Sequence, residues 1–165
     1  MRLTEDKVKA WLKKKALPVP DGAVASNAAD AISTANHLGP LVAVKALIPI
    51  GRRGKAGAVH LVKNAQEVGN VTSRLIGQKI NHFRVSNVYI EKQFPIEEEY
   101  YLSFTFGSQN PKILVCRRGG VDIEQTFEED PDSIISQSID PLKGLTPWSA
   151  IGLWERTGLK GKILS

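Results

Sequence analysis

At 165 residues and 42% hydrophobic content, the chain can bury a core as one domain, or as one domain with a small lobe. The single cysteine, Cys116, excludes an intrachain disulfide and a cysteine zinc cluster, and its apolar neighbours predict a buried strand thiol. The net charge of +5 is divided unevenly, with +9 in residues 1–95 and −4 in residues 96–165. A basic part facing an acidic part suits the binding of an anion together with its metal ion. Two solvated surfaces of opposite charge would give the same charge distribution along the sequence.

The same data disfavour membrane and nucleic-acid partners. No apolar run reaches the ~20 residues of a membrane-spanning helix. The first residues carry charges of both signs and lack the apolar core of a signal peptide. We therefore expect a cytoplasmic protein without a membrane partner. The basic first half would suit a nucleic-acid binder, but its aromatic residues are not interleaved with the basic ones, so we expect no nucleic-acid partner.

The first predicted element is a helix over about residues 4–15. Its first turn is acidic and its last turn holds three lysines at 13–15, and both features favour the helix dipole. Val8, Trp11 and Leu12 recur at the spacing of one helix face. The lysine run is therefore interpreted as the exposed end of a helix, and not as a nucleic-acid patch.

Residues 20–95 are predicted to alternate strands and helices. In chain order we expect a strand at 22–26, a helix capped by Ser26 or Asn27 that ends near Leu38, strands at 41–46 and 58–62, a helix capped by Asn64, and a strand at 87–92. This β-α-β-β-α-β order predicts a split βαβ sandwich of one sheet and two helices.

A glycine-rich basic loop, residues 51–57, connects the two central strands of this predicted sheet. It contains three glycines and three cations. Glycine lets backbone N–H groups approach a ligand closely, and Arg and Lys add charge that suits a polyphosphate. A solvated hairpin tip would have a similar composition. Because a strand follows the loop, it is neither a Walker A loop nor a Rossmann fingerprint, both of which open a helix.

Beyond Pro95 the predicted elements no longer alternate as in residues 20–95. We expect a hairpin of two strands, at 100–106 and 112–116, and Gly119-Gly120 ends its second strand. A short helix is predicted at 132–138. A second helix is predicted from Pro147 to about Arg156, because proline is favoured in the first helical position.

Six short motifs occur in a single order along the chain, at residues 44–45, 51–57, 90–91, 99–103, 119–124 and 140–142. Together they resemble the ATP-grasp region of the succinyl-CoA synthetase β-subunit superfamily. This superfamily includes malate–CoA ligase, citryl-CoA synthetase and ATP-citrate lyase. The resemblance covers nearly the whole chain, and six ordered motifs are far more specific than the glycine loop alone.

The resemblance implies an α/β (α+β) ATP-grasp-like fold in which two lobes clamp a nucleotide. Residues 20–95 would be the small split βαβ lid lobe. Residues 1–19 and 96–165 would be part of a larger, incomplete mixed-sheet lobe. The implied nucleotide-binding residues are Lys45 and the loop of Gly51, Arg52, Arg53 and Gly54 at the phosphates, Glu91 to Phe94 at the adenine, and Glu99 at the ribose.

The implied function is the nucleotide-binding portion of an ATP-dependent carboxylate–CoA ligase. The implied cofactors are ATP or GTP with Mg²⁺, and the family's Mg²⁺ ligands lie further along than Ser165. The implied partners are a small-molecule carboxylate and a second subunit or segment that carries a phosphohistidine and the CoA site. The chain alone is expected to be inactive, and no catalytic or metal-binding residue is assigned, since His37, His60 and His82 lack metal-ligand spacing.

An alternative is a reduced, non-catalytic homologue that serves as a structural or regulatory partner. Its motivation is the set of departures from the family pattern. Arg52 stands where many synthetase β-subunits have glycine, and Arg118 precedes the glycine pair where an acidic residue is typical. The absence of the family's Mg²⁺ ligands from this sequence also favours a non-catalytic homologue.

Overall fold

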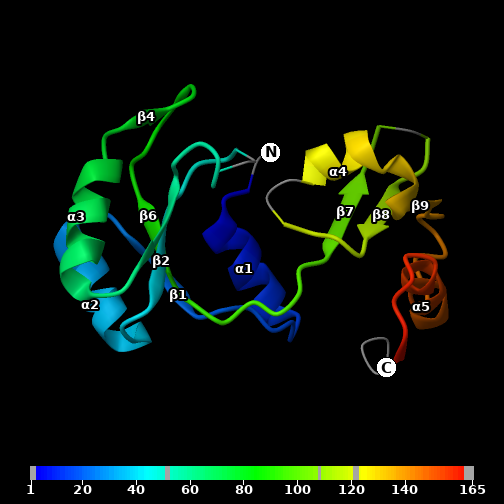
Figure 1. Cartoon of the computed structure of the whole chain (residues 1–165), viewed down its shortest axis with the longest axis horizontal. Coiled ribbons are helices and arrows are strands. Elements are labelled where there is room, and N and C mark those ends of the chain that lie inside the picture. Colours follow the sequence, from blue (N-terminus) through cyan, green and yellow to red (C-terminus); the bar gives the residue numbers. More distant parts are fainter. Residues whose placement is uncertain (1–2, 51–52, 108, 121–122, 162–165) are drawn as a thin grey trace. The chain divides into compact units, whose positions relative to one another are not determined.

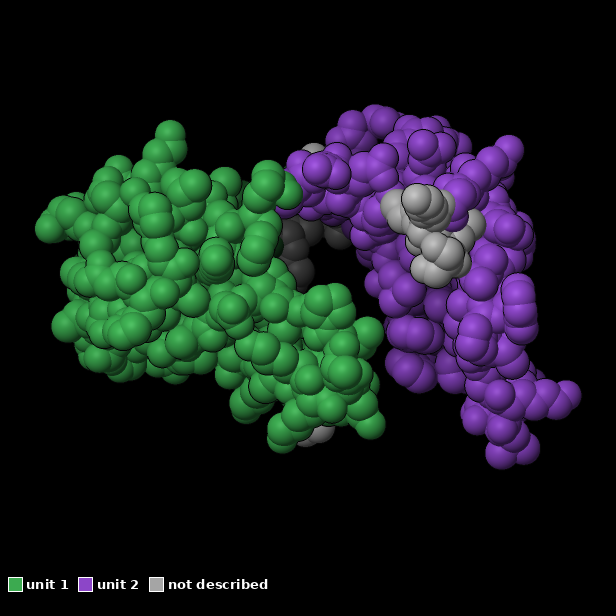
Figure 2. Space-filling view, turned by 90° about the horizontal axis from the view of Figure 1, so that it is seen from below, with its two compact units in different colours: residues 1–95 green, residues 96–165 purple. Residues whose placement is uncertain are grey.

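The computed structural model describes residues 3–50, 53–107, 109–120 and 123–161. The chain divides into two units, residues 1–95 and 96–165, which Figure 2 colours green and purple. The assignment of residues 1–19 to a larger lobe, together with residues 96–165, stays a prediction. No helix among the described residues is both long and apolar enough to cross a membrane.

A four-stranded antiparallel sheet forms the centre of the first unit, and its strand order is β1-β6-β2-β3. The β-α-β-β-α-β order is confirmed, and its elements are β1 (Gly22–Ala25), α2 (Ala28–Leu38), β2 (Val42–Ala46), β3 (Val59–Val62), α3 (Ala65–Leu75) and β6 (Val88–Lys92). Strand β6 lies between β1 and β2, and β2 lies between β3 and β6. Each βαβ unit is therefore split by a strand of the other.

Both helices of this sandwich begin at asparagine caps. The side chains of Asn27 and Asn64 accept the backbone N–H groups of Asp30 and Glu67, each at 2.9 Å. These bonds satisfy N–H groups that have no partner inside the helix. The caps identified from sequence therefore define where α2 and α3 begin.

The two faces of the sheet differ in chemistry. Val42, Val44 and Ile90 point to the face covered by α2 and α3 and belong to the buried core of the first unit. Lys45 and Glu91 point to the opposite face, because neighbours along a strand alternate in direction. Helix α1 (Glu5–Lys14) lies on that opposite face, across the sheet from α2 and α3 (Figure 1).

A second, two-stranded sheet in the first unit was not predicted. Strands β4 (Lys79–Ile80) and β5 (Phe83–Arg84) form a small hairpin whose turn contains Asn81 with φ of 54°. Ile80 is buried and Phe83 packs against the same core. Two-residue strands carry too little periodicity for recognition from sequence.

The second unit contains a three-stranded antiparallel sheet in the order β7-β8-β9. Its elements are β7 (Tyr101–Thr105), β8 (Lys112–Cys116), α4 (Ile123–Glu129), a 3₁₀ turn (Pro131–Ser133), β9 (Ile134–Ser138) and α5 (Pro147–Glu155). The predicted hairpin, the α5 helix and the buried Cys116 are confirmed.

The helix predicted at 132–138 is wrong, because residues 134–138 form strand β9. Ile135 pairs with Val115 and Ile134 with Cys116 across the sheet. The β-branched pair Ile134-Ile135 favours a strand, and pairing with a buried neighbouring strand decides the outcome. Helix α4 was also not predicted.

The buried helix residue Leu75 supplies a test of this core. Its side chain is 1% exposed, so Leu75→Ala is expected to leave a cavity and lower the free energy of unfolding by about 2–5 kcal/mol. Leu61→Ala is the matched control, since Leu61 is 71% exposed, and its effect is expected to stay within about 0.5 kcal/mol. Urea denaturation measures both, and equal losses would contradict this description of the core.

Candidate functional site

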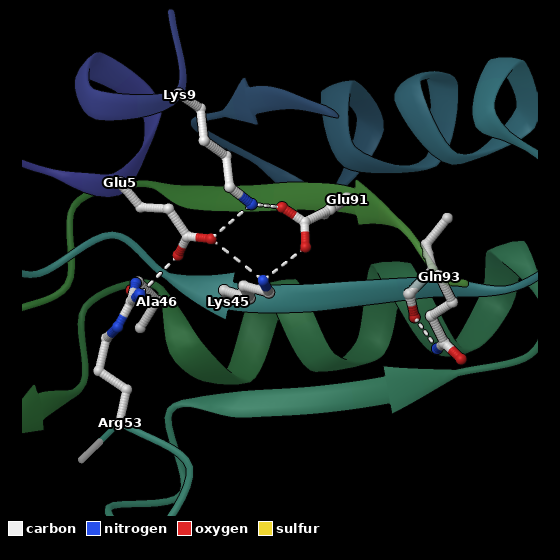
Figure 3. A network of polar contacts seen from close by, with 8 residues as sticks. Glu5, Lys9, Lys45, Ala46, Arg53, Glu91 and Gln93 are labelled. Carbon is white, nitrogen blue, oxygen red and sulfur yellow. Dashed lines mark hydrogen bonds and ion pairs between the residues drawn. The ribbon is translucent and has the colours of Figure 1, made fainter. Parts of the chain in front are cut away.

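Five charged side chains meet on the face of the first sheet that α1 covers (Figure 3). We call Glu5, Lys9, Lys45, Arg53 and Glu91 the charge cluster. Helix α1 supplies Glu5 and Lys9, strand β2 supplies Lys45, strand β6 supplies Glu91, and the loop after β2 supplies Arg53. Residues far apart in the chain therefore converge on one place.

Each carboxylate of the cluster contacts more than one cation. Glu5 Oε1 lies 2.7 Å from Lys9 Nζ and 3.1 Å from Lys45 Nζ. Glu91 Oε1 lies 2.6 Å from Lys45 Nζ, and Glu91 Oε2 pairs with Lys9. These four side chains form a closed ring of alternating charge. Arg53 is attached outside the ring, with Nη2 at 2.5 Å from Glu5 Oε2.

The electrostatics of the cluster are dominated by its cations. Burial raises the pKa of Glu5, but the hydrogen bond from Lys9 and the charges of Lys45 and Arg53 outweigh it and hold that pKa at about 2. Burial lowers the pKa of Lys9, and Glu5 opposes this change. With both carboxylates ionised, three cations face two anions. The surplus positive charge suits an anionic ligand.

The register of the sheet explains why Lys45 and Glu91 meet. Ala43 pairs with Glu91 and Lys45 pairs with Tyr89, so Lys45 and Glu91 are diagonal neighbours on one face. Because β2 and β6 are neighbouring strands, the long side chains of Lys45 and Glu91 reach each other across them. The sequence alone could not supply this register.

Sequence reasoning missed two members of the cluster, Glu5 and Lys9. Glu5 was interpreted only as a favourable charge at a helix N-terminus, and Lys9 was not considered. Their spacing of four residues, with glutamate first, is typical of an ion pair along a helix. That spacing was the available signal, but it does not say that both side chains face a sheet.

Three predicted site residues come together in the first unit: Lys45, Arg53 and Glu91. Gly54 lies in the turn that follows, and its carbonyl accepts the N–H of Gly57 at 3.1 Å. Gly51 and Arg52 lie outside the described residues. The nucleotide roles of all these residues stay predictions.

Phe94 and Glu99 are not members of the charge cluster. The Phe94 ring is 54% exposed, and Lys92 Nζ lies 5.6 Å from its centroid. Glu99 belongs to the second unit and is exposed. Their predicted contacts with adenine and ribose are not tested by this geometry.

A pair of glycines holds the backbone at Glu99 in place. The N–H of Gly119 donates to the carbonyl of Glu99 at 2.7 Å. A Cβ on Gly119 would lie 2.5 Å from the carbonyl carbon of Tyr100. Gly120 has a φ of +107°, and a Cβ there would lie 3.0 Å from Glu99 Oε2. The glycines that sequence analysis treated as a strand end are therefore required by this close approach.

An open depression of ≈ 540 Å³ borders the charge cluster. Glu5, Lys9 and Arg53 contribute its polar lining. Its apolar lining consists of Leu3, Val8, Leu12, Ile48, Pro49 and Ile50. The depression gives a ligand access to Arg53 from the first unit's surface.

The described part of the chain does not fit a magnesium ion. Among those residues, no group of three or more His, Cys, Asp or Glu side chains could hold a metal. The Glu5 and Glu91 carboxylates are already engaged by lysine and arginine.

Glu5 predicts a pH-dependent stability. Its pKa is about 2 in the folded chain against an ordinary 4.5, so ionised Glu5 stabilises the fold above pH 4.5 and this contribution is lost as the pH falls toward 2. Glu5→Gln is expected to cost about 2 kcal/mol at pH 7, after allowance for solvent screening, and less than half of that near pH 3.

Urea denaturation at the two pH values measures this difference. Glu97→Gln is the control, because Glu97 is exposed, and we expect an effect within about 0.5 kcal/mol at both values. A cost of Glu5→Gln that is the same at pH 7 and pH 3 would show that the carboxylate charge is not the source of the stabilisation.

The glycine pair supplies a second test in this region. Gly119→Ala is expected to destabilise the chain by about 1–3 kcal/mol, because the new Cβ meets backbone atoms that cannot move aside easily. Gly107→Ala is the matched control, since a Cβ there has no neighbour within 4 Å. Equal thermal stability of the two variants would disprove the close approach.

Comparison with known proteins shows the family to which the chain belongs. A family model of the ATP-grasp domain matches residues 2–165. The β subunit of ADP-forming succinate–CoA ligase from Hydrogenobaculum sp. (strain Y04AAS1) is 41% identical over 179 residues, which cover 100% of this chain and 47% of that protein. The corresponding subunit of Aquifex aeolicus is 39% identical over 160 residues, covering 91% and 41%. The chain thus spans less than half the length of these relatives.

Solved structures share the fold at low sequence identity. The dinucleotide-forming acetyl-coenzyme A synthetase 1 of Ca. Korarchaeum cryptofilum matches with a TM-score of 0.74 and 17% identity, covering 96% of this chain and 71% of that one. The ATP citrate lyase of Methanothrix soehngenii matches with a TM-score of 0.63 and 19% identity, covering 95% and 44%. The predicted resemblance and the mixed α/β fold are confirmed: the chain belongs to the ATP-grasp domain family.

Proposed function

We propose that the chain is the nucleotide-binding portion of an ATP-dependent carboxylate–CoA ligase of the succinyl-CoA synthetase β-subunit or ATP-citrate lyase kind. The observation that carries this proposal is the convergence of Lys45, Arg53 and Glu91 on one sheet face, in a chain that matches the ATP-grasp family over its length. The relatives' description as ADP-forming supports ATP over GTP as the nucleotide.

In this proposal the cations of the first unit bind the phosphates. Lys45 and Arg53 neutralise phosphate charge, and the loop of Gly51, Arg52 and Gly54 covers the phosphates. Arginine can bind two phosphate oxygens at once through its planar fork, whereas lysine acts as a point charge.

The remaining predicted residues hold the nucleoside. The segment from Glu91 to Phe94 lies against the adenine, and Glu99 accepts hydrogen bonds from the ribose hydroxyls. A carboxylate has lone pairs enough for two hydroxyl donors. The Gly119-Gly120 pair keeps Glu99 in position for this role.

The chain acts as one component of the ligase. Positioning and charge neutralisation are the main tasks of a protein in phosphoryl transfer, and this chain would perform them for the nucleotide. The phosphohistidine and the CoA site belong to a partner subunit or segment, and the acid substrate is a small-molecule carboxylate. The description of the relatives as β subunits supports such a partner. Bound Mg²⁺ would neutralise phosphate charge, but the described residues offer no ligand set for it.

A reduced, non-catalytic homologue is the second candidate. The observation in its favour is that the cations of the charge cluster are already paired with Glu5 and Glu91. A chain whose cations serve only its own carboxylates would bind no nucleotide.

Calorimetric titration with Mg-ATP tests the two candidates. Lys45→Met is expected to weaken binding by about tenfold or more, because a charge-assisted contact to phosphate is lost while the side-chain volume is kept. Lys14→Met is the control, since Lys14 is exposed in the last turn of α1, and its affinity should match that of the unaltered chain.

Circular dichroism establishes that both variants are folded before titration. Absence of heat from the unaltered chain at every salt concentration would refute nucleotide binding and favour the non-catalytic homologue. Equal affinities for Lys45→Met and Lys14→Met would refute the role of Lys45.

A further inference from the structure

Glu5 has a special position in the charge cluster, because it contacts all three of its cations. Glu91 contacts only the two lysines among the described pairs. The described ion pair of Arg53 is with Glu5, and its other described contact is a hydrogen bond from Nη1 to the carbonyl of Ala46 at 3.3 Å. The Glu5 carboxylate thus occupies Nη2 of Arg53, while Nη1 donates to the carbonyl of Ala46.

Accessibility differs between the two ends of the cluster. The Arg53 side chain is 22% exposed and that of Glu5 is 14% exposed, whereas that of Glu91 is 9% exposed. The open depression beside α1 is lined by Glu5 and Arg53 but not by Glu91. An anion that enters from this side therefore meets Glu5, Lys9 and Arg53 before Glu91, and Arg53 is the most exposed of these side chains.

Separating Glu5 from Arg53 would leave the rest of the cluster intact. Of the five ion pairs in the cluster, four lie in the ring of Glu5, Lys9, Glu91 and Lys45. The ring is neutral by itself, with two cations and two carboxylates. Arg53 carries the surplus charge, so it can exchange a carboxylate partner for a phosphate partner at the cost of one pair.

We propose that Glu5 is an internal competitor of the polyphosphate ligand, so that its carboxylate must release Arg53 before phosphate oxygens bind there. This inference rests on the proposed nucleotide function and adds the residue that limits its affinity. The ionised Glu5 carboxylate also repels a phosphate that approaches Arg53, because like charges repel strongly at short range. Glu5 therefore stabilises the unliganded chain and weakens its anion binding at once.

Calorimetry of Glu5→Gln with two probes, inorganic tripolyphosphate and Mg-ATP, tests the competition. Glutamine keeps the shape of the side chain but removes the charge, so both probes are expected to bind about tenfold more tightly than to the unaltered chain. A purely structural role for Glu5 would give unchanged or weaker binding, and either result would overturn the proposal.

Asp21→Asn is the matched control. Asp21 forms an exposed ion pair with Lys13 of helix α1, at 2.7 Å. Asp21→Asn changes the net charge of the chain by the same amount as Glu5→Gln. We expect affinities equal to those of the unaltered chain. An equal gain in both variants would assign the effect to net charge and contradict competition at Arg53.

The two probes separate this inference from the proposed function. If the unaltered chain binds Mg-ATP and Glu5→Gln binds it no more tightly, the competition is refuted and the proposed function stands. If neither binds Mg-ATP but Glu5→Gln binds tripolyphosphate more tightly, the proposed function fails and the competition stands. If neither probe binds either chain, both are refuted.

A measurement on the unaltered chain covers the case in which Glu5→Gln does not fold. The ¹³C resonance of the Glu5 side-chain carboxyl is expected to shift saturably as tripolyphosphate is added, because Arg53 leaves it. The carboxyl of Asp21 is the internal reference and should not shift. A Glu5 resonance that stays fixed at saturating probe would overturn the proposal.

Discussion

The Glu5 carboxylate is the contact on which the charged face of the first unit depends. It joins helix α1 to strand β2 and to the loop beyond it, through Lys45 and Arg53. Without its charge, three cations would be held close together with one carboxylate between them, and their mutual repulsion would act in a partly buried place. In the proposed function, the same charge that stabilises the cluster also occupies the cations that would bind phosphate, so under that proposal stability and affinity oppose each other at this residue.

The two faces of the first sheet carry different side chains, apolar on one face and charged on the other. Alternation along β2 and β6 sends valine and isoleucine toward α2 and α3, while Lys45 and Glu91 point toward α1. The apolar face stabilises the sheet by burial, and the rigid strands then hold the charged side chains in register. Of the three cations, Lys45 is held by strand β2 and Lys9 by helix α1, whereas Arg53 lies on the loop after β2.

In the second unit, the position of Glu99 is set by close backbone contacts and not by ion pairs. Gly119 lies so close to Tyr100 that a side chain would collide with the backbone, and Gly120 adopts a conformation that side chains rarely permit. The carbonyl of Glu99 is held by the N–H of Gly119. The Glu99 carboxylate has no ion-pair partner among the described residues. Its backbone is positioned by the glycine pair, and its oxygens remain available to a neutral hydroxyl donor.

The sequence by itself determined the β-α-β-β-α-β order of the sandwich in residues 20–95, but not its small β4–β5 hairpin, because caps and hydrophobic periodicity are local and two-residue strands carry too little of the latter. Its motifs also singled out Lys45, Arg53 and Glu91, which the structure brings into one cluster, while their nucleotide roles stay predictions. It did not identify Glu5 and Lys9, whose role arises where α1 lies against the sheet, nor strand β9, whose pairing with β8 overrides a weak local preference. Tertiary structure alone decided these, because register and helix placement depend on contacts between residues that are distant in the chain.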